Sequence, residues 1–130
     1  MLLVKNYLAP SQIHGIGVYA AEDIPEGALI WRYEKHFDRR FKPDEFLRLS
    51  EAIREYYLTY GYLSTADGKY YFPFDNDKFM NHSFRPNIRF DADGNFYAKV
   101  AIAKDEEMTC DYREFDQEWL RYAQGYPVDK

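Results

Sequence analysis

Short apolar runs separated by turn residues recur along most of the chain. Three early runs, at 2–8, 18–21 and 28–34, have the length and the β-branched and aromatic content that are typical of strands. Later runs of the same kind follow as far as the C-terminal quarter. The pattern therefore predicts a mostly β domain built from short strands.

Two Asp-Gly pairs mark predicted hairpin turns. Asp67-Gly68 and Asp93-Gly94 each lie between strand-like segments. Glycine tolerates the positive φ that tight hairpin turns require, so each pair suits the turn position. We expect the second pair to join a strand at 88–91 to one at 95–102.

One long amphipathic pattern predicts a helix at about 43–60, the main content of an insert between the early and late motifs. Pro43 suits its first turn and Gly61 can end it. A second and shorter helix is predicted at 116–123. The apolar residues of the first helix recur at spacings of three and four: Phe46, Leu49, Ile53, Tyr56 and Tyr60.

Composition narrows the class of protein. The 130 residues contain no repeat or linker and predict one domain over 1–130, and 13 Tyr, 10 Phe and 2 Trp predict an aromatic core and aromatic pocket walls. The net charge of -5 argues against direct nucleic-acid binding and favours a basic partner. A single cysteine, Cys110, excludes an internal disulfide and a multi-cysteine zinc site. With no membrane-length apolar run and no secretory signal, we expect a soluble intracellular protein.

Two polar motifs precede or follow predicted strands. In "GIGVYA", Gly15 to Ala20, the glycines permit either a tight turn or close approach of the backbone to a ligand. In "FMNHSFRPN", the triplet Asn81, His82 and Ser83 could satisfy buried backbone or line a polar pocket. A Ser83–His82 nucleophile pair is disfavoured, because adjacent residues on an extended chain point apart. Three scattered histidines show no metal-site spacing, so no metal is expected.

The C-terminal part holds two further candidates. "DEEMTCDY", 105–112, predicts an acidic turn and then a strand that ends at Asp111 and Tyr112, with Met108, Cys110 and Tyr112 on one face. Plain core packing would explain that face equally well. The tail from Arg113 to Pro127 is aromatic and predicts either a lid or a docked terminal helix, through three side chains: Phe115, Trp119 and Tyr122.

Taken in order, these motifs resemble those of the SET domain family of protein-lysine methyltransferases. The similarity rests on "GIGVYA", "DIPEGALIWRYE", "FMNHSFRPN" and "EEMTCDY", and it covers about residues 10–115. It implies a mainly β fold of small curved sheets, in which the Asn-His-Ser segment threads beneath the C-terminal motif in a knot-like arrangement. It also implies that S-adenosylmethionine is the cofactor.

The resemblance assigns cofactor contacts to six residues. Asn81 would hold the amino-acid end of the cofactor, and His82 would contact the adenine end, largely through its backbone. Ile16 and Gly17 would offer backbone groups from the other side. Phe115 or Trp119 would cover the adenine.

The resemblance also assigns the site of methyl transfer. Tyr112 matches the tyrosine that shapes it and is the expected catalytic residue. Cys110 occupies a position often filled by a ring that limits how many methyl groups fit, and Phe90 is a second ring that could fill the gap. The expected substrate channel is therefore Phe90, Cys110 and Tyr112. Asp105 departs from the family, which usually has glycine there.

In its compactness the chain looks like stand-alone viral or bacterial members of the family. The expected substrate is a lysine of a basic protein, with a histone or histone-like tail as the first choice. A non-histone protein substrate and a non-catalytic module that binds a peptide or the cofactor stay open. So do the degree of methylation, pairing into a homodimer, and a location in the cytoplasm, the nucleus or nucleoid, or a host cell.

Overall fold

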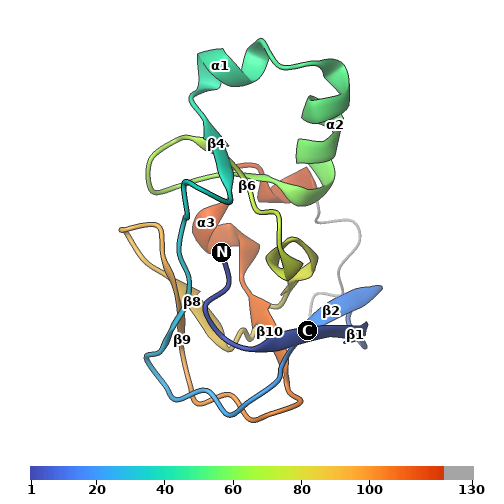
Figure 1. Cartoon of the computed structure of the whole chain (residues 1–130), viewed down its shortest axis with the longest axis vertical. Helices are drawn as coiled ribbons and strands as arrows, with labels where there is room; N and C mark the ends of the chain where they lie inside the picture. The colour runs from blue at the N-terminus through green and yellow to red at the C-terminus, as the bar shows by residue number, and fades with distance from the viewer. Residues whose placement is uncertain (122–130) are drawn as a thin grey trace.

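Three small sheets form the body of the domain (Figure 1). The computed structural model describes residues 1–121. The first sheet has the order β1 (Asn6–Pro10), β2 (Ile16–Ala20), β10 (Glu107–Cys110) and β7 (Asn81–His82). The second has the order β3 (Leu29–Trp31), β9 (Phe96–Ala98) and β8 (Ile88–Phe90), and the third the order β4 (Arg39–Phe41), β6 (Tyr70–Phe72) and β5 (Tyr62–Leu63). The predicted mainly β fold is confirmed.

Both predicted hairpins form. β5 and β6 pair antiparallel across a turn in which Gly68 has φ +70°. β8 and β9 pair antiparallel across a turn in which Gly94 has φ +85°. Both values lie in the left-handed region that favours glycine. The first predicted strand is shifted: β1 begins only at Asn6, and Leu2 keeps a single bridge to Trp31.

Two helices form where a single helix was predicted at 43–60, so the prediction of one continuous helix is wrong. α1 spans Pro43–Leu47 and α2 spans Glu51–Tyr60, and both lie at one end of the molecule (Figure 1). Ser50 separates them because its backbone is extended, with φ -60° and ψ 155°. Its hydroxyl accepts a hydrogen bond from the Ile53 N–H, so Ser50 starts a new helix.

The C-terminal motif also differs from its prediction. The strand ends at Cys110, and Tyr112 begins the helix α3 (Tyr112–Phe115), because the Asp111 carboxylate accepts the Arg113 N–H and caps it. No α-helix occupies 116–121 in the described chain, where Asp116 is extended and forms a bridge with Ser64. The remainder of the helix predicted at 116–123, including Tyr122, lies outside the described residues.

The core is aromatic, as the composition predicts. Trp31 is fully buried at its centre and meets Tyr62, Tyr71 and Phe96 edge to face. A second cluster of Phe46, Tyr57 and Phe72 joins α1 and α2 to the third sheet. Within residues 1–121, no helix is both long enough and apolar enough to cross a membrane.

Candidate active site

The two polar motifs meet through a parallel strand pair. β7 pairs with β10 so that Asn81 lies opposite Thr109 and His82 lies opposite Cys110. The Ser83 N–H continues the pairing by donating to the Cys110 carbonyl over 2.9 Å. Segments about thirty residues apart in sequence are therefore side by side, which places the Asn-His-Ser triplet next to the start of α3.

His82 supports Tyr112 from inside the domain. The Tyr112 backbone N–H donates to His82 Nδ1 over 3.0 Å, and the imidazole is only 3% exposed. Burial lowers the pKa of His82, although Asp111, whose carboxylate oxygen lies 3.8 Å from Nδ1, acts in the opposite direction. The ring is therefore neutral near pH 7, as its acceptor role at Nδ1 requires.

Asn81 fixes the glycine-containing turn. Its side-chain amide nitrogen donates to the carbonyls of His14 and Ile16 over 3.0 and 3.1 Å and to Glu107 Oε1 over 3.1 Å. Gly15 in this turn has φ +48°. Asn81 is 4% exposed, so these hydrogen bonds are sheltered from water and hold the 14–16 backbone in one position.

Sequence reasoning missed three residues that complete this scaffold: Ser11, Asn87 and Glu107. The Glu107 carboxylate accepts the Ser11 hydroxyl over 2.8 Å and lies so close to Gly17 that a Cβ there would be 2.1 Å from Oε1. The Asn87 side chain donates to the Glu107 carbonyl and accepts the Thr109 N–H. Glu107 resembled a surface acid and Asn87 a turn residue, so no local signal distinguished them.

A cavity of about 590 Å³ lies against this scaffold. Ile16, Asn81 and Tyr112 are on its wall, and their contacts with a cofactor stay predictions. Gly17 and His82 do not line the cavity. Gly17 packs against Glu107, and His82 accepts the Tyr112 N–H. The cavity is lined by His14, Gly15, Ile16, Leu58, Thr59, Tyr60, Lys78, Phe79, Met80, Asn81, Tyr112 and Arg121.

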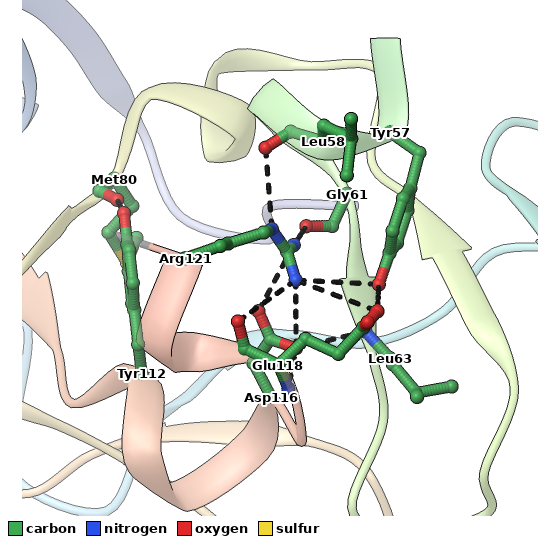
Figure 2. Close-up of polar contacts among 9 residues, drawn as sticks. All are labelled: Tyr57, Leu58, Gly61, Leu63, Met80, Tyr112, Asp116, Glu118 and Arg121. Carbon is green, nitrogen blue, oxygen red and sulfur yellow. Dashed lines mark hydrogen bonds and ion pairs between the residues drawn. The ribbon is translucent and has the colours of Figure 1, made fainter. Parts of the chain in front are cut away.

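A smaller inner pocket of about 40 Å³ shares a wall with the large cavity. Tyr112 belongs to both, and its hydroxyl donates to the Met80 carbonyl over 2.5 Å (Figure 2). Cys110 and Phe115 line only the inner pocket. Tyr112 is therefore at the junction of a space large enough for a cofactor and one that holds only a small group.

Three further predicted site residues do not line the large cavity. Phe115 is buried beside the inner pocket, away from the walls of the large cavity. Phe90 packs against Phe96, with ring centroids 4.9 Å apart, and lines neither space. Trp119 is partly buried and also lines neither. A cover for the adenine and a ring wall for the lysine channel therefore stay predictions for these residues.

Arg121 joins the end of α2 to the segment after α3 (Figure 2). Its guanidinium donates to the carbonyls of Leu58 and Gly61, and it pairs with the Asp116 carboxylate over 3.1 Å. Asp116 is 1% exposed, and its burial raises its pKa while Arg121 acts to lower it. Tyr57 donates to Glu118 beside them. Arg121 thus closes one wall of the large cavity.

Among residues 1–121, no group of three or more His, Cys, Asp or Glu side chains is placed to hold a metal ion.

Known proteins share this fold. The chain is 34% identical over 131 residues to the histone-lysine N-methyltransferase trr of Drosophila melanogaster. This match covers 86% of the chain and 5% of that protein. A putative histone methyltransferase of Plasmodium falciparum matches with a TM-score of 0.59 and 22% identity, over 92% of the chain and 99% of that structure. The autoinhibited Chaetomium Polycomb Repressive Complex 2 bound to S-adenosylmethionine matches with a TM-score of 0.63 and 21% identity, over 93% of the chain and 17% of that structure.

The chain thus spans only a small part of the Drosophila relative and of the Polycomb chain. The family model named SET domain matches residues 15–113, which include the glycine turn, the Asn-His-Ser segment and Tyr112. The chain therefore belongs to the SET domain family.

Proposed function

We propose that the protein transfers a methyl group from S-adenosylmethionine to the ε-amine of a lysine in a basic protein. The observation that carries the proposal is the position of Tyr112 between the large cavity and the inner pocket. Two reactants that enter from these two spaces would meet at its hydroxyl. The names of the Drosophila and Plasmodium proteins and the cofactor of the Polycomb structure support the same chemistry.

The large cavity fits the proposed cofactor. Its volume of about 590 Å³ suits a nucleoside joined to an amino acid. Lys78 and Arg121 on its wall supply positive charge for a carboxylate, and the 14–16 backbone supplies polar groups close to Asn81. When bound, S-adenosylmethionine supplies a methyl group activated by its sulfonium.

The residues of the chain contribute by positioning. The Tyr112 hydroxyl is fixed by the Met80 carbonyl, and its backbone is fixed by His82. A fixed hydroxyl and carbonyl can orient an incoming amine, and such alignment supplies much of the rate enhancement of a bimolecular transfer. Lysine reacts only as a neutral amine, and partial removal from water in the inner pocket disfavours the charged ammonium.

A basic protein is the substrate class that charge favours. The chain carries 17 basic and 22 acidic residues, which attracts a lysine-rich segment more readily than an acidic one. The Drosophila protein is a histone-lysine methyltransferase, and the Plasmodium protein is a putative histone methyltransferase. We therefore propose a histone or histone-like tail as the first substrate to examine, with non-histone proteins as the second.

Transfer of radiolabelled methyl from S-adenosylmethionine to core histones, bacterial nucleoid proteins and ribosomal proteins tests the proposal. We expect a labelled band that yields methyl-lysine on acid hydrolysis and that is lost with the Tyr112→Phe protein. Cofactor binding measured by calorimetry accompanies the assay. If the wild-type protein neither binds the cofactor nor labels any substrate, the proposal is contradicted and a non-catalytic module is favoured.

A further inference from the structure

An acidic side chain faces the inner pocket. Asp77 lies in the short 3₁₀-helix η1 (Asn76–Phe79) and lines this pocket together with Tyr112 and Cys110. Its backbone N–H donates to the Asp75 carboxylate over 3.1 Å, but within residues 1–121 no hydrogen bond reaches its own carboxylate. Asp77 is partly buried and lines the pocket, so the pocket is where its carboxylate can meet a ligand.

The charges around Asp77 come from several elements. Burial is the largest cause that raises its pKa to about 7, followed by the charge of Asp75, while Asp38 acts in the same direction and the N-terminal amine opposes it. The charge of Asp77 in turn contributes to raising the pKa of Tyr62 and of Cys110, so it acts directly on the pocket walls. The remaining charged or titratable residues on those walls are Tyr60, Lys78, Tyr112 and Asp116.

The fold does not depend on the Asp77 carboxylate. Asp75 caps η1 through its own carboxylate, which also accepts the Leu2 N–H over 2.7 Å. A carboxylate that is partly buried without a protein partner lowers stability, because burial disfavours its charge. A partly buried acid that makes no hydrogen bond through its carboxylate within residues 1–121 and lines a reaction pocket is a candidate for chemistry.

We propose that the Asp77 carboxylate accepts the proton that the lysine ammonium must lose in the inner pocket. This inference rests on the proposed function, and it adds a residue to it. The pocket of about 40 Å³ has room for an amine beside the carboxylate and the Tyr112 hydroxyl. The carboxylate also attracts a cationic side chain into a pocket whose walls carry one lysine, Lys78, among aromatic rings.

The proton transfer balances without another reactant. One N–H bond of the ammonium breaks and one O–H bond forms on Asp77, so the nitrogen keeps an electron pair and becomes a neutral amine. Asp77 becomes a neutral acid and returns the proton to water afterwards. An unperturbed aspartate is roughly 6 pKa units more acidic than lysine, whereas an aspartate with a pKa of about 7 reduces that gap to roughly 3. Desolvation of the ammonium in the pocket narrows this gap in pKa, whereas its attraction to the carboxylate widens it.

The Asp77→Asn variant tests the inference in a methyl-transfer assay. We expect kcat near neutral pH to fall at least about 100-fold, as for loss of a general base, while cofactor affinity is unchanged. The rise of kcat with pH that Asp77 causes near its pKa should also disappear. Asp93→Asn is the matched control, since Asp93 is exposed in the β8–β9 turn. A kcat within twofold of wild type would overturn the inference.

A second measurement does not need activity. In protein labelled with ¹³C at its aspartate carboxyls, the signal missing from the Asp77→Asn variant identifies Asp77, and n-butylamine serves as a probe for the lysine side chain. We expect the probe to shift this signal in the wild-type and Asp93→Asn proteins. An unchanged signal would overturn the inference. A shifted signal in a protein that labels no substrate would contradict the proposed function but support the contact.

Discussion

Tyr112 donates its backbone N–H to Nδ1 of His82 over 3.0 Å, and the two rings lie 5.2 Å apart. The imidazole therefore belongs to the support of the proposed catalytic tyrosine. It is held in its neutral form by burial, in a segment that pairs in parallel with the strand before Tyr112. This relationship explains why an imidazole follows Asn81 in the chain.

Loss of the His82 ring should affect both stability and turnover. His82→Ala leaves the Tyr112 N–H without this acceptor, and we expect the free energy of unfolding to fall by about 1 to 3 kcal/mol. Turnover should fall more than cofactor affinity, because the change acts through Tyr112. Urea denaturation and steady-state kinetics measure the two effects.

Two further variants show whether the lost hydrogen bond causes the effect of His82→Ala. His82→Asn keeps a side-chain acceptor at a similar position and should restore part of the lost turnover. His36→Ala removes an exposed histidine and should change nothing. Equal losses in His82→Ala and His82→Asn would argue that the hydrogen bond is unimportant.

Asn81→Ala should weaken cofactor binding. The substitution removes the donor that holds the carbonyls of His14 and Ile16 and the Glu107 carboxylate. We expect a loss of about 1 to 3 kcal/mol in binding free energy, measured by titration calorimetry. Asn95→Ala removes an amide in the β8–β9 turn and serves as control. Unchanged affinity in Asn81→Ala would remove this residue from the cofactor site.

Arg121→Ala should loosen the wall between α2 and the segment after α3. It leaves the buried Asp116 carboxylate without its ion-pair partner, so the free energy of unfolding should fall by about 2 to 4 kcal/mol. Cofactor affinity should fall as well. Arg54→Ala, on the exposed face of α2, is the control for thermal and chemical denaturation. Equal stability of the two variants would contradict the role of Arg121.

Asp77 should make stability depend on pH. Because its pKa of about 7 in the folded protein lies above the ordinary value of 3.8, the folded protein binds an extra proton between these values. The resulting stability is fully present below about pH 4 and is lost as the pH rises to about 7. Relative to wild type, Asp77→Asn should therefore gain about 2 to 4 kcal/mol over this range in urea denaturation. A pH-independent difference would show that the carboxyl is not enclosed.

Sequence patterns predicted the parts of the fold that depend on local chemistry. The Asp-Gly turns formed because Gly68 and Gly94 adopt positive φ, and the family followed from four motifs in order. The helix break at Ser50 was missed because the apolar spacing continues across it. The start of α3 was missed because Asp111 caps a helix within what resembled a strand.

Sequence motifs suggested two residues that the structure places on the wall of the large cavity. Asn81 and Tyr112 line it, and their roles toward a cofactor and a substrate stay predictions. Glu107 and Arg121 were not, because their roles depend on neighbours that only the tertiary structure supplies. Asp77 belongs to this second class, since a surface aspartate and an enclosed one look alike in sequence.

The most direct measurement compares methyl transfer by the wild-type and Tyr112→Phe proteins at saturating S-adenosylmethionine, with the affinity for the cofactor measured on both. We expect removal of the hydroxyl to lower turnover at least about 100-fold, because the reacting amine loses its orienting group, while affinity for the cofactor changes less than about twofold. Turnover equal to wild type with the same affinity would contradict the placement of Tyr112 at the centre of the reaction.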